Sequence, residues 1–118
     1  MLGLQIGFHC AVLIAINNLR DVEGDKLVNK KTWPVRFGKT FARLEIAALC
    51  FVPFMMQGYW FLRGYRFVAL TYLSLPLAIQ ITRLVFKTEP SPAYNKFLGL
   101  SAGLHLLFGI LISIGLIL

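Results

Sequence analysis

The sequence predicts an all-α, multi-pass transmembrane helical bundle, and three observations support this prediction. Of the 118 residues, 58% are hydrophobic and only 14% are charged, with a mean hydropathy of +0.72. A soluble domain usually carries about 25% charged residues. The apolar residues also gather into four long runs, each close to the roughly 20 residues with which a helix crosses a bilayer.

The four apolar runs define the predicted membrane spans, which in chain order are residues 1–19, 44–62, 67–86 and 97–118. The second and third spans contain Pro53 and Pro76, and we expect each proline to kink its helix because it removes a backbone donor. Small residues let helix backbones approach closely, so Gly99 and Gly103 predict tight packing of the last span.

The connections between the spans predict the topology. The long connection 20–43 holds seven basic residues, and the connection 87–96 together with Arg83 at its edge holds three, whereas the turn 63–66 has only two. The positive-inside rule therefore places both basic connections in the cytoplasm and both termini on the other side. Because the net charge of +7 lies at the ends of apolar runs, we expect it to face membrane lipid headgroups, with no nucleic acid as a partner.

The segment "NNLRDVEGDKLVNKKT" at 17–32 runs from the end of the first span into the long connection and contains the candidate functional residues. It contains Asp21, Glu23 and Asp25, although the whole chain has only 5 acidic residues. If the first helix continues past residue 18, then Asn17, Asp21 and Asp25 are spaced by four and share one helix face. Hard oxygen ligands suit Mg²⁺, which commonly binds one or two carboxylates and completes its shell with substrate phosphates. The spacing therefore predicts a magnesium–diphosphate site.

Basic residues flank this segment and are candidates for binding phosphate; they are Arg20, Lys30, Lys31 and Arg36. The alternative is a solvated face with ordinary ion pairs, in which Glu23 pairs with Lys26 or Lys30. Two carboxylates at i and i+4 repel each other unless a cation joins them, which favours the site. At this stage both interpretations stay open.

The segment "NNLRDVEGDKLVNKKTWPVRFGK" resembles the second aspartate-rich motif, D-x-x-x-D followed by a basic stretch, of the UbiA-type membrane prenyltransferases. Together with "PSPAYNKFLGLSAGLHLLFG" near the end, it is most similar to members of that family that act on 1,4-dihydroxy-2-naphthoate in menaquinone biosynthesis. The resemblance covers nearly the whole chain.

This resemblance implies a nine-helix bundle in the cell inner (plasma) membrane, with a central cavity open to the cytoplasm and to lipid. Two aspartate-rich motifs, one in each half, hold Mg²⁺ ions that bind the polyprenyl diphosphate. The allylic diphosphate ionises, and an electron-rich carbon of the aromatic acceptor captures the cation. The implied cofactor is Mg²⁺, and the implied substrates are a polyprenyl diphosphate and 1,4-dihydroxy-2-naphthoate.

Carried over by motif position, Asp21 and Asp25 match the metal-binding, catalytic aspartates, and Asn17 or Asn18 matches the asparagines that precede them. The basic stretch expected to meet diphosphate falls on Lys30 and Lys31, with Arg20 and Arg36 as further candidates. No N-D-x-x-D-like first motif occurs in the chain. We therefore expect the C-terminal part of such an enzyme, a fragment that needs an N-terminal half carrying the first motif.

Three alternatives remain at the level of sequence. A prenyltransferase acting on another aromatic acceptor, such as 4-hydroxybenzoate, fits the same motif. The CDP-alcohol phosphotransferases also end a motif in D-x-x-x-D, but their upstream D-G-x-x-A-R is missing from this chain. A truncated membrane interaction protein or remnant, without catalysis, is the third.

Overall fold

The computed structural model describes residues 1–118 and contains helices but no strands, which confirms the predicted all-α class. The elements in chain order are α1 (Leu2–Arg20), α2 (Val22–Leu27), α3 (Trp33–Phe37), α4 (Lys39–Met55), α5 (Gln57–Leu62), the 3₁₀ helix η1 (Arg66–Ser74), α6 (Leu75–Lys87) and α7 (Tyr94–Ile117).

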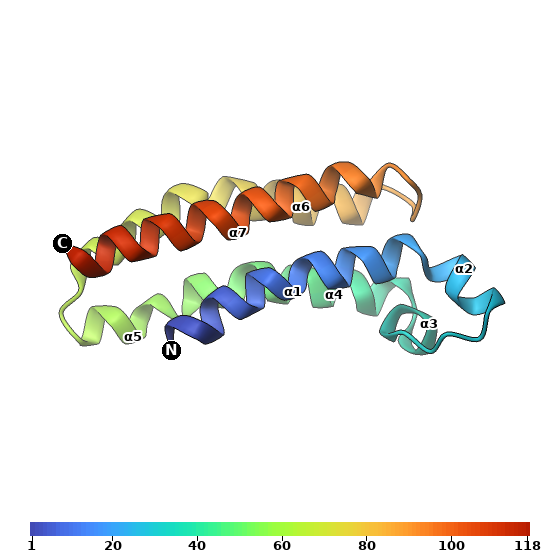
Figure 1. Ribbon diagram of the computed structural model, residues 1–118, viewed down its shortest axis with the longest axis horizontal. Helices are drawn as coiled ribbons and strands as arrows, with labels where there is room; N and C mark the ends of the chain where they lie inside the picture. Colours follow the sequence, from blue (N-terminus) through green and yellow to red (C-terminus); the bar gives the residue numbers. More distant parts are fainter.

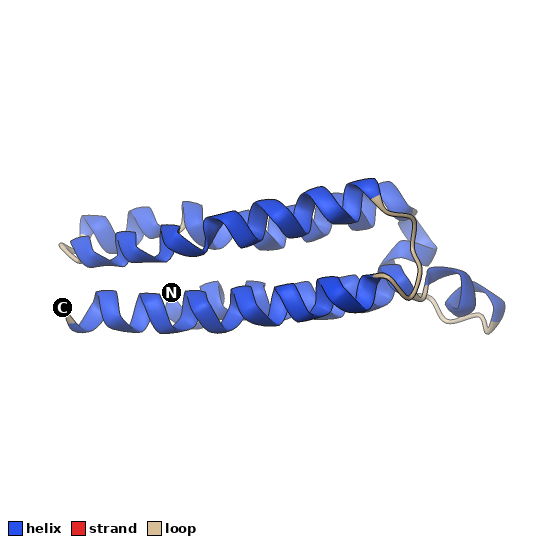
Figure 2. Cartoon of the chain, turned by 90° about the horizontal axis from the view of Figure 1, so that it is seen from above, coloured by secondary structure: helices blue, strands red, loops and turns tan.

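These elements form an elongated bundle measuring 51 × 22 × 17 Å. Helices α1 and α4 make one layer, and η1, α6 and α7 make the other, with α1 packed against α7 and α4 against α6 (Figure 1). Both termini lie at one end of the bundle, while α2, α3 and the connection before α7 lie at the opposite end (Figures 1 and 2). The two basic connections therefore share one end of the molecule.

Four helical segments are long and apolar enough to cross a membrane, as predicted; they are Leu2–Arg20, Lys39–Leu62, Arg66–Lys87 and Tyr94–Ile117. The second membrane span begins with α4 at Lys39, five residues before the predicted start at residue 44. Gly38, at φ 93°, separates it from α3 in a conformation that favours glycine. Arg43 fits inside this helix because its Nε donates a hydrogen bond to the Val85 carbonyl at 2.8 Å.

The third span changes its helix type close to the predicted kink at Pro76. Residues 66–74 form a 3₁₀ helix, which is longer than the usual three or four residues, and α6 starts one residue before Pro76. Thr71 in η1 accepts a hydrogen bond from Gln57 Nε2 at 2.9 Å and donates one to the Val68 carbonyl. A side-chain contact from α5 therefore supports the 3₁₀ segment.

Among the glycines, Gly115 has the least space around it, at the point where α7 meets η1. A Cβ atom there would lie 2.6 Å from the Phe67 carbonyl oxygen. Gly99 and Gly103 have nothing within 4 Å of the corresponding position, so the prediction that they mediate packing within this chain is wrong. The reason is orientation, because these two glycines are exposed on the outer side of α7.

The core is mainly apolar, and one of its polar clusters lies between α1 and the C-terminal part of α4. Gln5 Nε2 donates to the Pro53 carbonyl at 2.9 Å, and His9 Nε2 bonds the Cys50 carbonyl at 3.1 Å. Trp60 Nε1 donates to Gln5 Oε1 at 2.7 Å. Buried polar groups are costly unless they are paired, so these bonds fix α1 against the α4–α5 break and hold the bundle that carries the motif.

Candidate functional site

The motif lies at the end of the bundle where α1 passes into α2. Asp21 is the junction residue, at φ −96° and ψ 10°. Its N–H donates to the Asn17 carbonyl at 3.1 Å, and the Asp25 N–H donates to the Asp21 carbonyl at 2.8 Å. Both bonds join residues four positions apart, as in an α-helix. The helical path therefore continues past residue 18, as predicted.

The two aspartates differ in environment. The Asp21 side chain is 47% exposed, whereas Asp25 is only 9% exposed. The chain turns back after α2 through Asn29, which is at φ 55°, so that the Lys30 N–H reaches the Asp25 carbonyl oxygen at 2.8 Å. Asparagine tolerates this left-handed conformation better than most residues.

Asp25 has a buried carboxylate oxygen, Oδ2, with no hydrogen-bond partner. A buried acceptor without a donor is rare in folded proteins and costs free energy, more so when it belongs to a charged group. Such an atom is satisfied by a bound cation or by a donor from another molecule. In this respect the carboxylates fit the Mg²⁺ that the sequence predicts.

A cavity of about 510 Å³ opens beside both aspartates and is lined by Arg20, Asp21, Gly24, Asp25, Pro92 and Asn95. Its volume is within the range of small-molecule sites. Four of these residues come from the motif, and two come from the segment around the start of α7. The site is therefore built from two parts of the chain that are about 70 residues apart.

Arg20 connects the two parts of the cavity wall. Its Nε donates to Asp21 Oδ1 at 2.8 Å, and its Nη2 donates to Asp21 Oδ2 at 2.9 Å. Its Nη1 donates to Asn95 Oδ1 at 2.7 Å. The pKa of Asp21 is lowered, mainly by the hydrogen bonds from Arg20 and further by the positive charges of Arg20 and Lys30, while partial burial opposes the shift.

The structure brings together some of the predicted site residues and not others. Arg20, Asp21 and Asp25 line the cavity, and Lys30 is near enough for its charge to act on Asp21. The remaining predicted residues do not line it; they are Asn17, Asn18, Lys31 and Arg36. Lys31 and Arg36 are exposed, in the turn after α2 and on α3.

Sequence reasoning missed Asn95. Nothing in a single sequence distinguishes this asparagine from other polar residues of a turn. One indirect signal existed: the connection 87–96 is basic, as is the motif connection, so the two were expected on the same side of the membrane.

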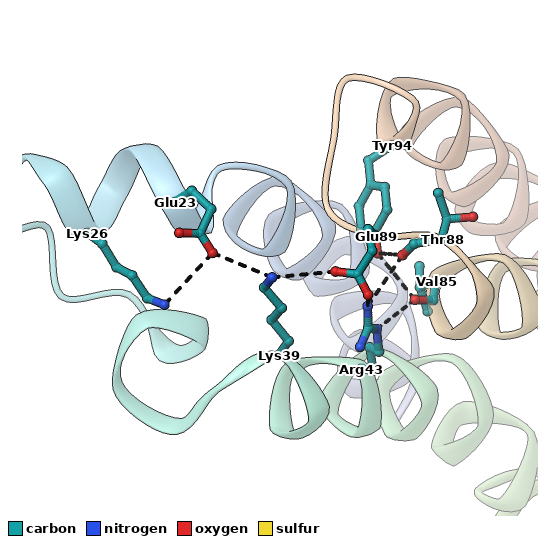
Figure 3. A network of polar contacts seen from close by, with 8 residues as sticks. All are labelled: Glu23, Lys26, Lys39, Arg43, Val85, Thr88, Glu89 and Tyr94. Atoms are coloured by element: carbon teal, nitrogen blue, oxygen red, sulfur yellow. Dashed lines mark hydrogen bonds and ion pairs between the residues drawn. The ribbon is translucent and has the colours of Figure 1, made fainter.

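Glu23 belongs to an ion-pair network and not to the cavity (Figure 3). It pairs with Lys26 at 3.9 Å, as predicted, and with Lys39 at 3.5 Å. Lys39 in turn lies 3.4 Å from Glu89, which also pairs with Arg43 at 3.5 Å. Exposed ion pairs contribute about 0–1 kcal/mol each, so the network orients the two connections more than it stabilises the chain.

Stronger bonds hold the start of α7 beside the network. The buried Tyr94 hydroxyl lies 2.6 Å from the Thr88 carbonyl oxygen, to which it donates, and 3.2 Å from that of Val85. These bonds close the turn between α6 and α7 (Figure 3). Because Asn95 follows Tyr94 directly, the same bonds fix the amide that binds Arg20.

The chain has no group of three or more His, Cys, Asp or Glu side chains that could hold a metal ion by themselves. Asp21 and Asp25 provide two carboxylates, which is the number that Mg²⁺ often takes from a protein when substrate phosphates complete its shell. The set therefore fits a metal that is shared with a phosphorylated substrate or with ligands from outside this chain.

The fold and the site define an integral membrane protein with an acidic cavity at one end of a four-span helical bundle. A family model, the UbiA prenyltransferase family, matches residues 1–115. The chain belongs to this family.

A similar protein is the 1,4-dihydroxy-2-naphthoate octaprenyltransferase of Haemophilus influenzae, which is 31% identical over 117 residues. The aligned region covers 94% of this chain and 37% of that protein, so the chain spans little more than a third of the relative's length. No solved structure matches the chain significantly.

Proposed function

We propose that this chain forms one half of the Mg²⁺–diphosphate site of a membrane prenyltransferase. The enzyme would transfer a polyprenyl group from a polyprenyl diphosphate to an aromatic quinone precursor. Two observations about Asp25 carry this proposal in a chain of the UbiA family: its buried Oδ2 has no hydrogen-bond partner, and the residue lines a cavity together with Asp21.

In this proposal Asp21 and Asp25 hold Mg²⁺, which when bound neutralises charge on the departing diphosphate. Arg20 in the cavity wall, and Lys30 beside it, bind the phosphate oxygens that the metal does not reach. Lys31 and Arg36 are exposed and do not line the cavity, so their role in binding diphosphate stays a prediction. Asn17 and Asn18 precede the cavity along α1, and their role as additional ligands stays a prediction.

For the acceptor we propose 1,4-dihydroxy-2-naphthoate, within menaquinone biosynthesis. The name of the Haemophilus influenzae relative supports this choice, since that protein is an octaprenyltransferase for this compound. Another aromatic acceptor, 4-hydroxybenzoate, is the competing choice within the same reaction.

We further propose that catalysis needs an N-terminal half carrying a first aspartate-rich motif. Two features support this requirement: the chain spans 37% of its relative, and it contributes only two cavity carboxylates. The basic connections that hold the site would face the cytoplasm across the inner membrane, because positive charges are retained on that side.

The test is prenyl transfer in membranes with 1,4-dihydroxy-2-naphthoate, a polyprenyl diphosphate and Mg²⁺, using the chain alone and then with an N-terminal half supplied. We expect product only with the added half, falling at least about 100-fold in Asp25→Asn. Glu23→Gln is the matched control, because it removes a neighbouring carboxylate outside the cavity. No product with the added half would overturn the proposal, and product from 4-hydroxybenzoate alone would change the acceptor.

A further inference from the structure

We infer that Arg20 is an internal counter-cation. It pairs with Asp21 while the site is empty, and when the metal binds it leaves Asp21, keeps its bond to Asn95 and turns to the diphosphate. This inference rests on the proposed function, because it assumes that the two aspartates hold a metal. It assigns a positioning role to Asn95, a residue outside the motif.

Arg20 pairs with Asp21 through both carboxylate oxygens. Both carboxylate oxygens accept hydrogen bonds from the guanidinium, at 2.8 and 2.9 Å. A two-pronged arginine–carboxylate pair of this kind is among the stronger side-chain interactions. Each oxygen keeps a further lone pair, but the positive charge of the guanidinium opposes a second cation at the same carboxylate, so Arg20 competes with a metal ion for Asp21.

Asp25 differs from Asp21 because its carboxylate has no cationic partner. Asp25 Oδ2 is buried and has no partner, although the cavity holds a cationic guanidinium. With two carboxylates and one guanidinium, the charged groups of the cavity sum to −1 when the site is empty. A cation is thus attracted first to Asp25, and its charge then competes with Arg20 for Asp21.

Asn95 is a second partner of Arg20. Asn95 Oδ1 accepts from Nη1 at 2.7 Å, and this bond uses a different nitrogen from the two that bind Asp21. Because a guanidinium carries five donors in a rigid fork, Arg20 can keep the Asn95 bond after leaving Asp21. Its freed Nε and Nη2 donors then face the cavity, where a diphosphate would bind.

The position of Asn95 is fixed by the turn that precedes α7. It lies in the first turn of α7, next to Tyr94, whose hydroxyl is bonded to the end of α6. Asn95 acts on the metal only through Arg20, so its effect must disappear when Arg20 is replaced. This dependence separates a positioning role from a general effect on folding.

The experiment measures Mn²⁺ binding, as a paramagnetic substitute for Mg²⁺, by the purified chain in lipid nanodiscs, with and without inorganic pyrophosphate. Without pyrophosphate, we expect Arg20→Gln to bind Mn²⁺ about fivefold more tightly. The change removes the exposed Arg20–Asp21 ion pair, which competes with the metal for Asp21. The same variant should bind pyrophosphate more weakly. Arg63→Gln, at the opposite end of the bundle, is the control and should change neither affinity.

Asn95→Ala should weaken Mn²⁺ binding in the wild-type background. In the empty site Asp21 still holds the guanidinium, whereas after displacement Asn95 is its remaining partner, so the loss costs more in the metal-bound state. In the Arg20→Gln background the same change should have no effect, which a double-mutant cycle detects. An equal loss in both backgrounds would overturn the role of Asn95.

Two outcomes separate this inference from the proposed function. If Asp25→Asn abolishes Mn²⁺ binding but Arg20→Gln leaves it unchanged, the metal site stands and the counter-cation inference is wrong. If no variant shows Asp25-dependent binding, both are wrong. Since a variant can misfold, the NMR signal of the Arg20 Nε–H group in the wild-type chain provides a second test: it should shift on Mg²⁺ addition, and an unmoved signal would overturn the inference.

Discussion

Arg20 and Asn95 are 75 residues apart in the sequence, yet the Arg20 Nη1 donates to Asn95 Oδ1 at 2.7 Å. This bond joins the two walls of the cavity, which come from the motif and from the segment around the start of α7. Because Asn95 directly follows Tyr94, its position depends on the Tyr94 hydrogen bonds that close the turn between α6 and α7.

Tyr94→Phe removes the hydroxyl that bonds the Thr88 carbonyl at 2.6 Å and leaves the ring in place. We expect the free energy of unfolding in detergent micelles to fall by about 1 kcal/mol, the usual contribution of one hydrogen bond. Proteolytic cleavage within residues 88–93 should become faster. Tyr65→Phe, at an exposed site near the other end, is the control, and equal losses in both variants would contradict this account.

Gly115→Ala tests the contact between α7 and η1. The new methyl group would lie 2.6 Å from the Phe67 carbonyl oxygen and 2.8 Å from Val68 Cα, both backbone atoms that cannot rotate away. Overpacking of this kind costs about 1–3 kcal/mol, which thermal or denaturant unfolding in micelles should detect.

The matched control for that prediction is Gly103→Ala on the same helix. Nothing lies within 4 Å of the corresponding position, and alanine is the better helix former. We expect its stability in the isolated chain to be unchanged or slightly higher. A Gly103→Ala variant that is destabilised as much as Gly115→Ala would show that orientation does not explain the difference.

Mg²⁺ should stabilise the wild-type chain through Asp25. A ligand that binds only the folded state, present at ten times its dissociation constant, adds about 1.4 kcal/mol to the free energy of unfolding. We expect this increment to be lost in Asp25→Asn and kept in Glu23→Gln, because the Glu23 carboxylate pairs with Lys26 and Lys39 outside the cavity. Melting curves recorded with Mg²⁺ and with EDTA measure it, and an increment that survives in Asp25→Asn would place the metal elsewhere.

The lowered pKa of Asp21 predicts an acid limb in the stability of the metal-free chain. A carboxyl group with a depressed pKa in the folded state contributes stability that is complete above its ordinary pKa of about 4 and is lost as the pH falls through the lowered value. The contribution is modest, because the Asp21 side chain is 47% exposed. Unfolding measured in EDTA across acid pH should show this loss in the wild type and a smaller one in Arg20→Gln. An acid limb of equal size in both would mean that Arg20 does not cause it.

Much of the fold could be read from local sequence. Composition and run length predicted four spans, and four are found. The positive charge of the connections 20–43 and 87–96 predicted that both lie on one side of the membrane, and the two connections share one end of the bundle (Figure 1). The spacing in the motif predicted that Asp21 and Asp25 belong to one site, and both line the same cavity. These features depend on neighbours within a few residues, which is why a single sequence contains them.

The tertiary structure alone decided which surfaces meet. The last span is apolar on all sides, so its sequence does not indicate that Gly115 faces η1 while Gly99 and Gly103 face outward. Likewise, no local pattern marks Asn95 as the partner of Arg20, or Asp25 as the buried aspartate and Asp21 as the exposed one. These relationships follow from how helices distant in sequence rotate and pack against one another, and packing is a property of the assembled bundle that hydrophobic run length and motif spacing do not specify.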